Sequence, residues 1–232
     1  MYRIPLLLFL SLLFFSCTKD PKMEPNGKPK VKIKDVTIHP VDFEEEKEQG
    51  RDSWQQPEVV LNKMGNLKGQ KVADIGAYFG YFTFILAHRG AEVVAIDIDN
   101  EMLKFIRETA AKQNHPNFKK NIDYRLVKSD DPGLKNEEVD QVLLVNMMGY
   151  LGDRIDYLKR LEHGLKPGGQ FNIVDFKMKR LPATFDIPKN ERVYADKIEE
   201  ELHSIGLKNI SIDDTSLEYQ YIITANKAQV TN

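Results

Sequence analysis

The sequence has almost no cysteine and almost no net charge. A single cysteine stands among 232 residues, which excludes an intrachain disulfide and a zinc site built from several cysteines. The net charge is only −2, so the chain as a whole has no electrostatic attraction for nucleic acid, and we expect no nucleic-acid partner. The five histidines stand in no pattern typical of metal ligands, so the sequence predicts no metal site.

The N-terminus resembles an export signal. Arg3 precedes an apolar run, Ile4–Phe15, that is interrupted only by a proline and a serine. As a helix this run spans about 18 Å, well short of a membrane core of about 30 Å. The run is therefore typical of the core of a signal peptide and too short for a transmembrane helix.

Cys17 follows this run at once, in F-F-S-C, which resembles the lipidation signal of bacterial lipoproteins. The resemblance implies cleavage after Ser16, lipidation of Cys17 and an exported protein that is anchored to the membrane of the cell envelope. The alternative is an ordinary secretory signal with an incidental cysteine. A position at the cytoplasmic face of the membrane also stays open.

The centre of the chain predicts a buried strand, a tight glycine turn and a helix. It runs from Val72 to Ala87 and reads VADIGAYFGYFTFILA. The first N–H groups of a helix have no partner within the helix, so a turn that leads into a helix favours an anionic group. Asp97 ends the next apolar run, 21 positions after Gly76, which is the spacing of a ribose-binding carboxylate in nucleotide-binding α/β domains.

This turn lacks the middle glycine of dinucleotide-binding domains. It reads G-A-Y-F-G, with Tyr78 and Phe79 where a pyrophosphate needs close approach to the backbone. A nicotinamide-dependent oxidoreductase is therefore disfavoured. A ligand with a ribose and no phosphate fits better, and S-adenosylmethionine (SAM) is such a ligand.

Three segments resemble a class I SAM-dependent methyltransferase. They are V-A-D-I-G-x-x-x-G at Val72–Gly80, V-V-A-I-D-I-D at Val93–Asp99 and L-K-P-G-G at Leu165–Gly169. The resemblance implies a Rossmann-like α/β fold, with a doubly wound, mostly parallel seven-stranded sheet and a terminal antiparallel hairpin. It also implies SAM as the cofactor and a small-molecule or lipid-like methyl acceptor.

The predicted organisation follows from these segments. It comprises a signal peptide at 1–16, a lipid-anchor cysteine and charged linker at 17–50, a methyltransferase-like domain at 51–227 and a tail at 228–232. We expect strands at 71–75, 92–97, 122–127, 139–145, 170–176, 209–213 and 219–226. We expect helices at 58–64, 80–89, 153–164 and 191–205, and one that starts at Asp99 or Asn100 in a region that Pro116 ends.

The resemblance implies cofactor contacts at the carboxyl ends of the strands. The expected residues are Asp74, Gly76, Ala77, Gly80, Asp97, Ile98, Asp130 and Asn146. Asp97 is expected to accept the ribose hydroxyls, and Gly76 and Ala77 to offer backbone to the methionine part. Asp74 is expected to orient the turn or the ammonium group.

Two further positions have implied roles. Asp130 is expected to receive the adenine amino group, with Asp131 as its rival, and Asn146 is expected to lie near the methyl group. Asp175, which also ends a strand, is expected to be structural.

Four side chains near the turn have two interpretations each. Tyr78 and Phe79 either line the cofactor pocket or fill it. Trp54 and Gln55 either cover the cofactor, or Trp54 merely fixes its helix to the domain.

The sequence names no catalytic residue. Methyl transfer mainly requires that the nucleophile and the methyl group are held in line, and a general base is optional. Two functions therefore compete: a SAM-dependent methyltransferase, and a non-catalytic, lipid-anchored ligand-binding or scaffolding protein that keeps the fold. The export signal motivates the second, because SAM is not expected outside the cytoplasm.

Overall fold

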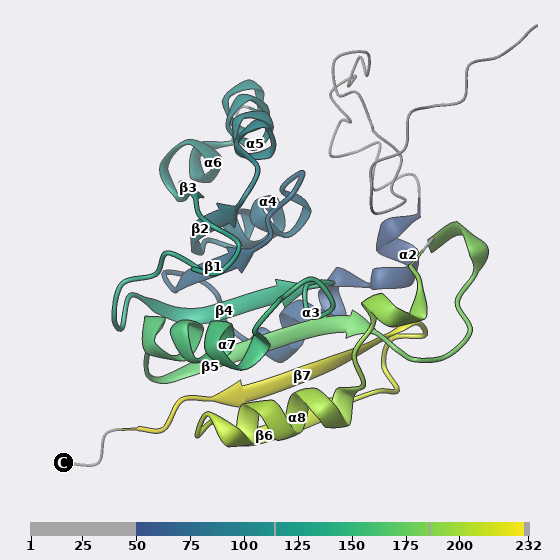
Figure 1. The fold of residues 1–232 in the computed structure, drawn as a ribbon. Coiled ribbons are helices and arrows are strands. Elements are labelled where there is room, and N and C mark those ends of the chain that lie inside the picture. Colours follow the sequence, from purple (N-terminus) through teal and green to yellow (C-terminus); the bar gives the residue numbers. More distant parts are fainter. Residues whose placement is uncertain (1–49, 114, 186, 230–232) are drawn as a thin grey trace, which may run out of the picture. The chain divides into compact units, whose positions relative to one another are not determined.

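The structure is a computed structural model and describes residues 50–113, 115–185 and 187–229. The proposed signal peptide, Cys17 and nearly all of the linker lie outside these residues. The described part contains one seven-stranded sheet in the order β3-β2-β1-β4-β5-β7-β6 (Figure 1). The strands are β1 (Lys71–Ile75), β2 (Glu92–Asp97), β3 (Ile122–Leu126), β4 (Val139–Val145), β5 (Leu165–Phe176), β6 (Lys208–Asp213) and β7 (Gln220–Asn226).

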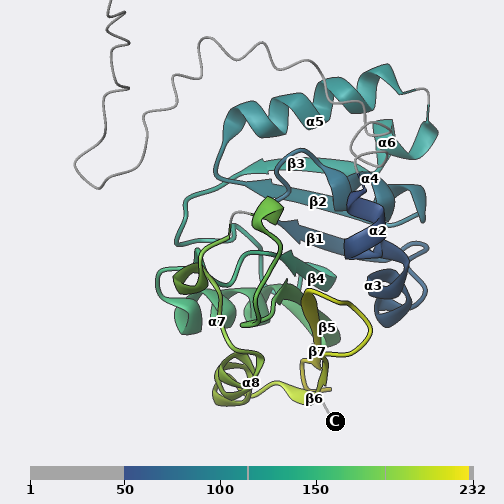
Figure 2. The same ribbon diagram turned by 90° about the vertical axis from the view of Figure 1, so that its right-hand side faces the viewer.

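The sheet is parallel from β3 to β5 and antiparallel at β7 and β6. Figure 2 shows the strands stacked in this order, from β3 at the top to β6 at the bottom. This arrangement confirms the fold class expected from the sequence. Because the parallel strands share one direction, their carboxyl ends lie along a single edge of the sheet.

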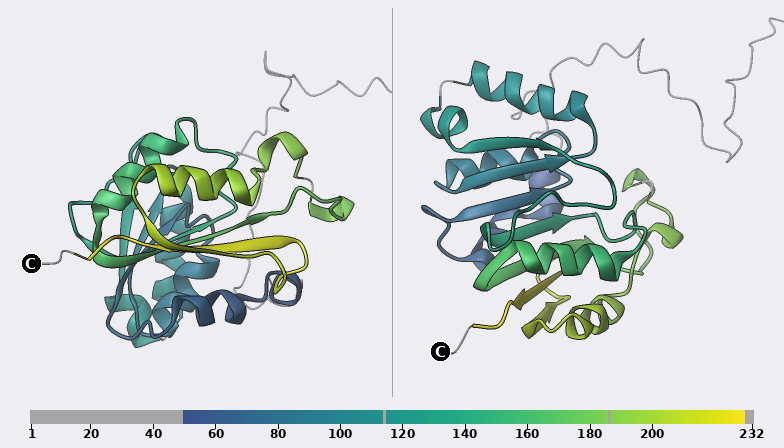
Figure 3. Two further views of the ribbon diagram at one scale, coloured as in Figure 1. Left: turned by 90° about the horizontal axis from the view of Figure 1, so that it is seen from below. Right: turned by 60° about the vertical axis from the view of Figure 1, so that its left-hand side comes forward.

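Helices cover both faces of the sheet. They are α2 (Arg51–Gln55), α3 (Pro57–Met64), α4 (Tyr81–His88), α5 (Asn100–Lys112), α6 (Pro116–Lys120), α7 (Arg154–Gly164) and α8 (Ala195–Ser204), with short 3-10 helices η2 (Ala183–Phe185) and η3 (Lys189–Glu191). Figure 3 (left) shows the yellow-green helix α8 and the blue helix α3 on opposite sides of the sheet. A doubly wound arrangement of this kind buries the central strands on both faces.

Strand β1 shows how the two faces are divided. Val72 packs into a core cluster with residues of α3, α4 and α5, while Ala73 and Ile75 pack into a second cluster with residues of α7 and α8. All three side chains are at most 1% exposed. This alternation explains why β1, β2 and β4 appear in the sequence as continuous apolar runs.

Two predicted boundaries were wrong at proline and glycine positions. Pro116 was expected to end a helical region, but it is the first residue of α6, where the missing N–H of proline is not needed. Strand β5 begins at Leu165, so Pro167-Gly168-Gly169 lies inside the strand and does not precede it. The ladder between β4 and β5 shifts register there, which accommodates the irregular backbone.

The predicted helix at 191–205 is shorter than expected. Residues 189–191 form η3, and α8 starts only at Ala195. Between them the backbone is extended, with Arg192 at φ −114°. The Arg192 guanidinium donates to the carbonyls of Ile187 and Lys179, which holds this segment out of the helix. Within the described residues, no helix has the length and apolar character needed to cross a membrane.

Candidate functional site

The carboxyl ends of β1, β2 and β4 bring most of the expected residues together. Ile75 pairs with Ile96 of β2 on one side and with Leu144 of β4 on the other. Gly76 and Asp97 directly follow Ile75 and Ile96, and Asn146 directly follows the last residue of β4, Val145, so the three residues share one edge of the sheet. Asp130 and Asp131 lie in the turn after β3, the next strand along this edge.

The glycine turn is closed by its own hydrogen bonds. The N–H groups of Gly76 and Ala77 both donate to the carbonyl of Ile96, at 2.9 and 3.0 Å. These two N–H groups are therefore engaged by β2, and a ligand at the turn has to contact other atoms. Gly80 precedes α4 with φ 84°, and a Cβ there would lie only 3.0 Å from Ile106 and from Phe84.

Asp97 is held rigidly at the end of β2. It is 9% exposed, and its two carboxylate oxygens accept the backbone N–H groups of Tyr78, at 2.8 Å, and of Asp99, at 2.9 Å. A carboxylate oxygen has two lone pairs, so each oxygen can accept a further hydrogen bond from a ligand hydroxyl. The geometry thus fixes the carboxylate against the turn without exhausting its capacity as an acceptor.

The side chain nearest to Gly76 is that of Met147, and not the ring of Tyr78 or of Phe79. Tyr78 adopts a left-handed backbone, φ 50°, and is 57% exposed, while the Phe79 ring packs edge-on against Phe105 of α5 at 5.4 Å. A Cβ added to Gly76 would instead overlap the sulfur of Met147. Sequence analysis missed Met147, although its position just after the end of β4 was a signal.

Asp74 orients the start of α4. Its buried carboxylate accepts the hydroxyl of Thr83 at 2.6 Å and also the backbone N–H of Thr83. Burial raises the pKa of Asp74 to about 6, although the bonds from Thr83 and the positive charge of Arg51 act in the opposite direction. The first of its two expected roles, orienting the turn, therefore fits the geometry.

Two large apolar side chains next to Asp97 are exposed. Ile98 is 63% exposed and Leu126, which pairs with Asp97 in the β2–β3 ladder, is 55% exposed. An apolar surface beside a carboxylate at the same sheet edge suits a flat heterocycle attached to a sugar. Ile98 was expected from the sequence, whereas Leu126 was not.

The structure separates the two rival aspartates after β3. Asp131 accepts the N–H of Gly133 at 2.8 Å, and so stabilises its own turn. Asp130 is exposed and accepts no hydrogen bond within the part of the chain that the structure describes. This difference favours Asp130 as the carboxylate that can contact a ligand.

Asn146 and Asp175 come from neighbouring strands at this edge. Asn146 directly follows β4, and Asp175 lies near the end of β5. Asn146 has a left-handed backbone, φ 57°, and its amide oxygen accepts the side-chain N–H of Gln220 at 2.6 Å. The buried carboxylate of Asp175 accepts the N–H groups of Met148 and Phe176, and burial raises its pKa to about 6. Asp175 thus holds the loop after β4 onto β5, which fits its expected structural role.

Helix α2 lies at this edge and is fixed there by side chains. In Figure 1 the arrowheads of β4 and β5 point toward it. The guanidinium of Arg51 lies 3.9 Å from the centre of the Tyr81 ring, and the Tyr81 hydroxyl bonds to Asp52. Trp54 stacks on Phe176 of β5, with ring centres 5.8 Å apart. This contact fixes the helix to the domain, which is one of the two roles expected for Trp54.

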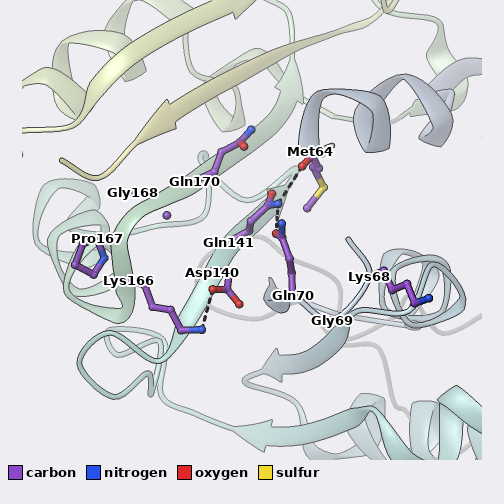
Figure 4. A pocket seen from close by; sticks show the side chains of 11 residues that line it. Met64, Lys68, Gly69, Gln70, Asp140, Gln141, Lys166, Pro167, Gly168 and Gln170 are labelled. Carbon is purple, nitrogen blue, oxygen red and sulfur yellow. Dashed lines mark hydrogen bonds and ion pairs between the residues drawn. The ribbon is translucent and has the colours of Figure 1, made fainter. Parts of the chain in front are cut away.

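A cavity of about 500 Å³ lies at the opposite edge of the sheet, at the amino ends of β1, β4 and β5 (Figure 4). The side chain of Gln141 donates there to the carbonyl of Met64 and to Gln70, and Lys166 pairs with Asp140. These polar groups satisfy one another, so we assign this cavity no ligand. In the described ranges no cluster of His, Cys, Asp and Glu could hold a metal ion.

The segment from β1 to β5 is similar in sequence to known proteins. Residues 73–173 match the family model described as "Methyltransferase domain". The chain is 31% identical over 111 residues to a ubiquinone biosynthesis O-methyltransferase of Acinetobacter baumannii (strain ACICU), which is 47% of this chain and 45% of that protein. It is 30% identical over 122 residues to a demethylmenaquinone methyltransferase of Tropheryma whipplei (strain Twist), covering 53% and 48%.

The solved structures agree with these matches at the level of the fold. The crystal structure of a SAM-dependent methyltransferase from Aquifex aeolicus superposes with a TM-score of 0.67 and 21% identity, covering 81% of this chain and 97% of that one. The chain spans about half the length of the curated relatives it matches. Residues 73–173 thus match a methyltransferase domain, in a chain that has the fold of this SAM-dependent methyltransferase.

Proposed function

We propose that this protein is a SAM-dependent methyltransferase that acts on a small-molecule or lipid-like acceptor. The observation that carries the proposal is the fixed carboxylate of Asp97. Its oxygens can each accept a further hydrogen bond from a ligand, and the exposed side chains of Ile98 and Leu126 lie beside it. A sugar with two hydroxyls joined to a flat base matches these neighbours. The match of residues 73–173 to a methyltransferase domain supports the choice of SAM over other nucleosides.

Four residues at the edge have roles in holding the adenosine part of the cofactor. Asp97 accepts the ribose hydroxyls, Ile98 and Leu126 contact the adenine faces, and Asp130 accepts the adenine amino group. Bound SAM supplies a methyl group that its sulfonium has already activated. The remaining task of the protein is to place the acceptor in line with that methyl group and to exclude water. Met147 lies against Gly76, so its flexible side chain has to turn aside when the methionine part binds.

The acceptor class is a further part of the proposal. The printed names of two relatives refer to ubiquinone biosynthesis and to demethylmenaquinone, so quinone-type compounds are the first class to test. An exposed aromatic side chain supports an apolar acceptor, because Tyr150 lies in the loop after β4 and is 62% exposed. Exposed aromatic rings beside a binding edge suit a ring-containing compound.

Calorimetric titration tests the cofactor assignment. We expect the purified protein to bind SAM and its demethylated product S-adenosylhomocysteine, and the Asp97→Asn variant to bind both more weakly. Asp156→Asn, the same change at an exposed position of α7, serves as the control and should bind like wild type. No binding of either compound by the wild-type protein would end the proposal.

The second candidate is a non-catalytic, lipid-anchored protein that binds a ligand or a partner on the same fold. The apolar run before Cys17 favours it, because export separates the domain from cytoplasmic SAM. Stronger thermal stabilisation by another nucleoside or by a lipid than by SAM would favour this candidate.

We also propose that Cys17 is lipidated and anchors the protein to a membrane. Cell fractionation of the wild type and of Cys17→Ala tests this directly. The wild type should sediment with membranes, and the alanine variant should move to the soluble fraction. Retention of the variant in membranes would remove the lipid anchor from the account.

A further inference from the structure

Four polar side chains form a continuous chain of hydrogen bonds from α2 to the candidate site. Arg51 Nε donates to Gln55 Oε1 at 2.7 Å, and Gln55 Nε2 donates to Gln220 Oε1 at 3.3 Å. Gln220 Nε2 then donates to Asn146 Oδ1 at 2.6 Å. Gln55 and Gln220 are both 0% exposed, so water does not compete for these bonds.

Arg51 sets the direction of every hydrogen bond in this series of side chains. A guanidinium can only donate, so Gln55 has to turn its amide oxygen toward Arg51 and its NH2 group toward Gln220. The constraint passes on to Asn146, because a flipped amide would place two donors or two acceptors face to face in a buried position. Asn146 therefore keeps its amide oxygen toward Gln220 and its NH2 group away from it.

The NH2 group of Asn146 is left for a ligand. In the ranges that the structure describes, Asn146 uses its backbone N–H for the carbonyl of Val174 and its amide oxygen for Gln220, and its NH2 group donates to no protein atom. Asn146 directly follows β4, the neighbour of β1, so it lies at the same edge as the Gly76 turn. The chain of bonds thus presents a donor, with a fixed orientation, at the place assigned to the methionine part of SAM.

We infer that Asn146 donates through its NH2 group to the methionine carboxylate of SAM, and that Gln220 is the residue that positions it. This inference rests on the proposed function. The methionine tail offers a carboxylate, which only accepts, and an ammonium group, which only donates, so a fixed donor selects the carboxylate. The series of hydrogen bonds begins at the positive charge of Arg51, which also favours an anion at its other end, beside Asn146.

A donor at this position serves the cofactor better than the methyl acceptor. A hydroxyl nucleophile has to lose a proton as it attacks, and an acceptor group helps that loss whereas a donor does not. Gln220 contacts Asn146 and not the ligand, so it is a positioning residue. Its effect should appear in the binding of the carboxylate tail and not in the binding of adenosine.

The Gln220→Glu variant reverses the polarity of the chain. A carboxylate at position 220 still accepts from Gln55, but it can no longer donate to Asn146. Asn146 then has to turn its NH2 group toward residue 220, which points its amide oxygen at the ligand. We expect the Kd of S-adenosylhomocysteine to rise about tenfold or more, because a lost hydrogen bond to a charged group has this order of effect.

A tail-less ligand separates this effect from a general loss of structure. 5′-Methylthioadenosine carries the adenosine and the sulfur without the carboxylate, and its Kd should change less than about twofold in Gln220→Glu. Gln170→Glu is the matched control, because Gln170 lies in β5 near the opposite edge of the sheet. It should leave the affinity for both ligands unchanged.

Asn146→Asp gives an independent test if Gln220→Glu does not fold. An aspartate at 146 still accepts from Gln220 but cannot donate to the tail, so it should weaken S-adenosylhomocysteine and spare 5′-methylthioadenosine. An unchanged ratio of the two Kd values in the variants overturns the inference and leaves the proposed function standing. If the wild-type protein binds neither ligand, the proposed function fails and the inference falls with it.

Discussion

The carboxylate of Asp97 accepts the backbone N–H of Tyr78 at 2.8 Å, and this bond ties the end of β2 to the glycine turn after β1. A second bond, from the N–H of Asp99, fixes the other oxygen. A carboxylate that two backbone groups hold in place needs no reorganisation when a ligand hydroxyl arrives. The proposed function depends on this arrangement more than on any other.

Replacing Asp97 by asparagine should weaken the binding of SAM. The amide keeps one acceptor for Tyr78, but its NH2 group faces either the N–H of Asp99 or a ribose hydroxyl, and the negative charge is lost. We expect the Kd of S-adenosylhomocysteine to rise about 10- to 100-fold, as for the loss of a charged acceptor. Equal affinities of Asp97→Asn and wild type in calorimetry would speak against the ribose contact.

Asp130 and Asp131 should differ in their effects on base recognition. Asp130→Ala removes an acceptor that the protein itself does not use, so it should reduce the preference for S-adenosylhomocysteine over its deaminated, inosine-containing analogue. Asp131→Ala is the control, because that carboxylate caps the turn at Gly133. It should lower thermal stability and leave the preference unchanged. The reverse pattern would transfer the adenine contact to Asp131.

Replacement of Gly76 by alanine should destabilise the protein more than the same replacement at Gly69, a glycine with nearly the same φ value. Gly76 and Gly69 have φ values of 73° and 74°, but a Cβ at Gly76 would overlap the Met147 sulfur, whereas a Cβ at Gly69 would meet nothing within 4 Å. Gly76→Ala should therefore lower the free energy of unfolding by about 1–3 kcal/mol more than Gly69→Ala. Denaturant unfolding measures this difference.

The variant Met147→Ala provides the second half of that experiment. With the sulfur removed, the steric part of the Gly76→Ala penalty should disappear, and a double-mutant cycle isolates it. An identical penalty with and without Met147 would show that the sulfur is not what occupies the space at Gly76.

Asp74 should make stability fall as the pH rises from about 4 to about 6. Its pKa is raised from 3.8 to about 6 by burial, so the folded state holds a proton that the unfolded state has already released. The stabilisation is present below the unfolded pKa and is lost as the pH passes the folded one. The Asp74→Asn variant has no carboxyl group to titrate, so it does not lose this stabilisation. As the pH rises from about 4 to about 6, the free energy of unfolding of the variant should therefore increase relative to that of the wild type by up to about 3 kcal/mol. Urea unfolding at pH 4.5 and at pH 7.5 compares the two proteins, and a constant difference would contradict the assignment.

The sequence was sufficient to predict those parts of the fold that local patterns determine. Strands β1, β2 and β4 were predicted with the bounds that the structure shows, because each is a buried apolar run between turn residues. Asp97 could be selected because a strand end, a preceding glycine turn and their spacing coincide at one residue.

Long-range contacts explain what the sequence could not predict. Gln220 is 74 positions from Asn146 and sits in a strand of ordinary pattern, so nothing local marks it as a partner of the site. The occupation of the Gly76 and Ala77 N–H groups depends on the carbonyl of Ile96 in the neighbouring strand. The start of β5 was missed because a proline and two glycines normally indicate a turn, and here the sheet absorbs them through a shift in register.

The most direct test changes the sugar and leaves the protein intact. Titration of the wild-type protein with S-adenosylhomocysteine and with its 2′,3′-dideoxy analogue compares ligands that differ only in the hydroxyls assigned to Asp97. The account predicts that the analogue binds at least about tenfold more weakly, and that Asp97→Asn removes most of this difference. Equal binding of the two ligands by the wild-type protein would contradict it.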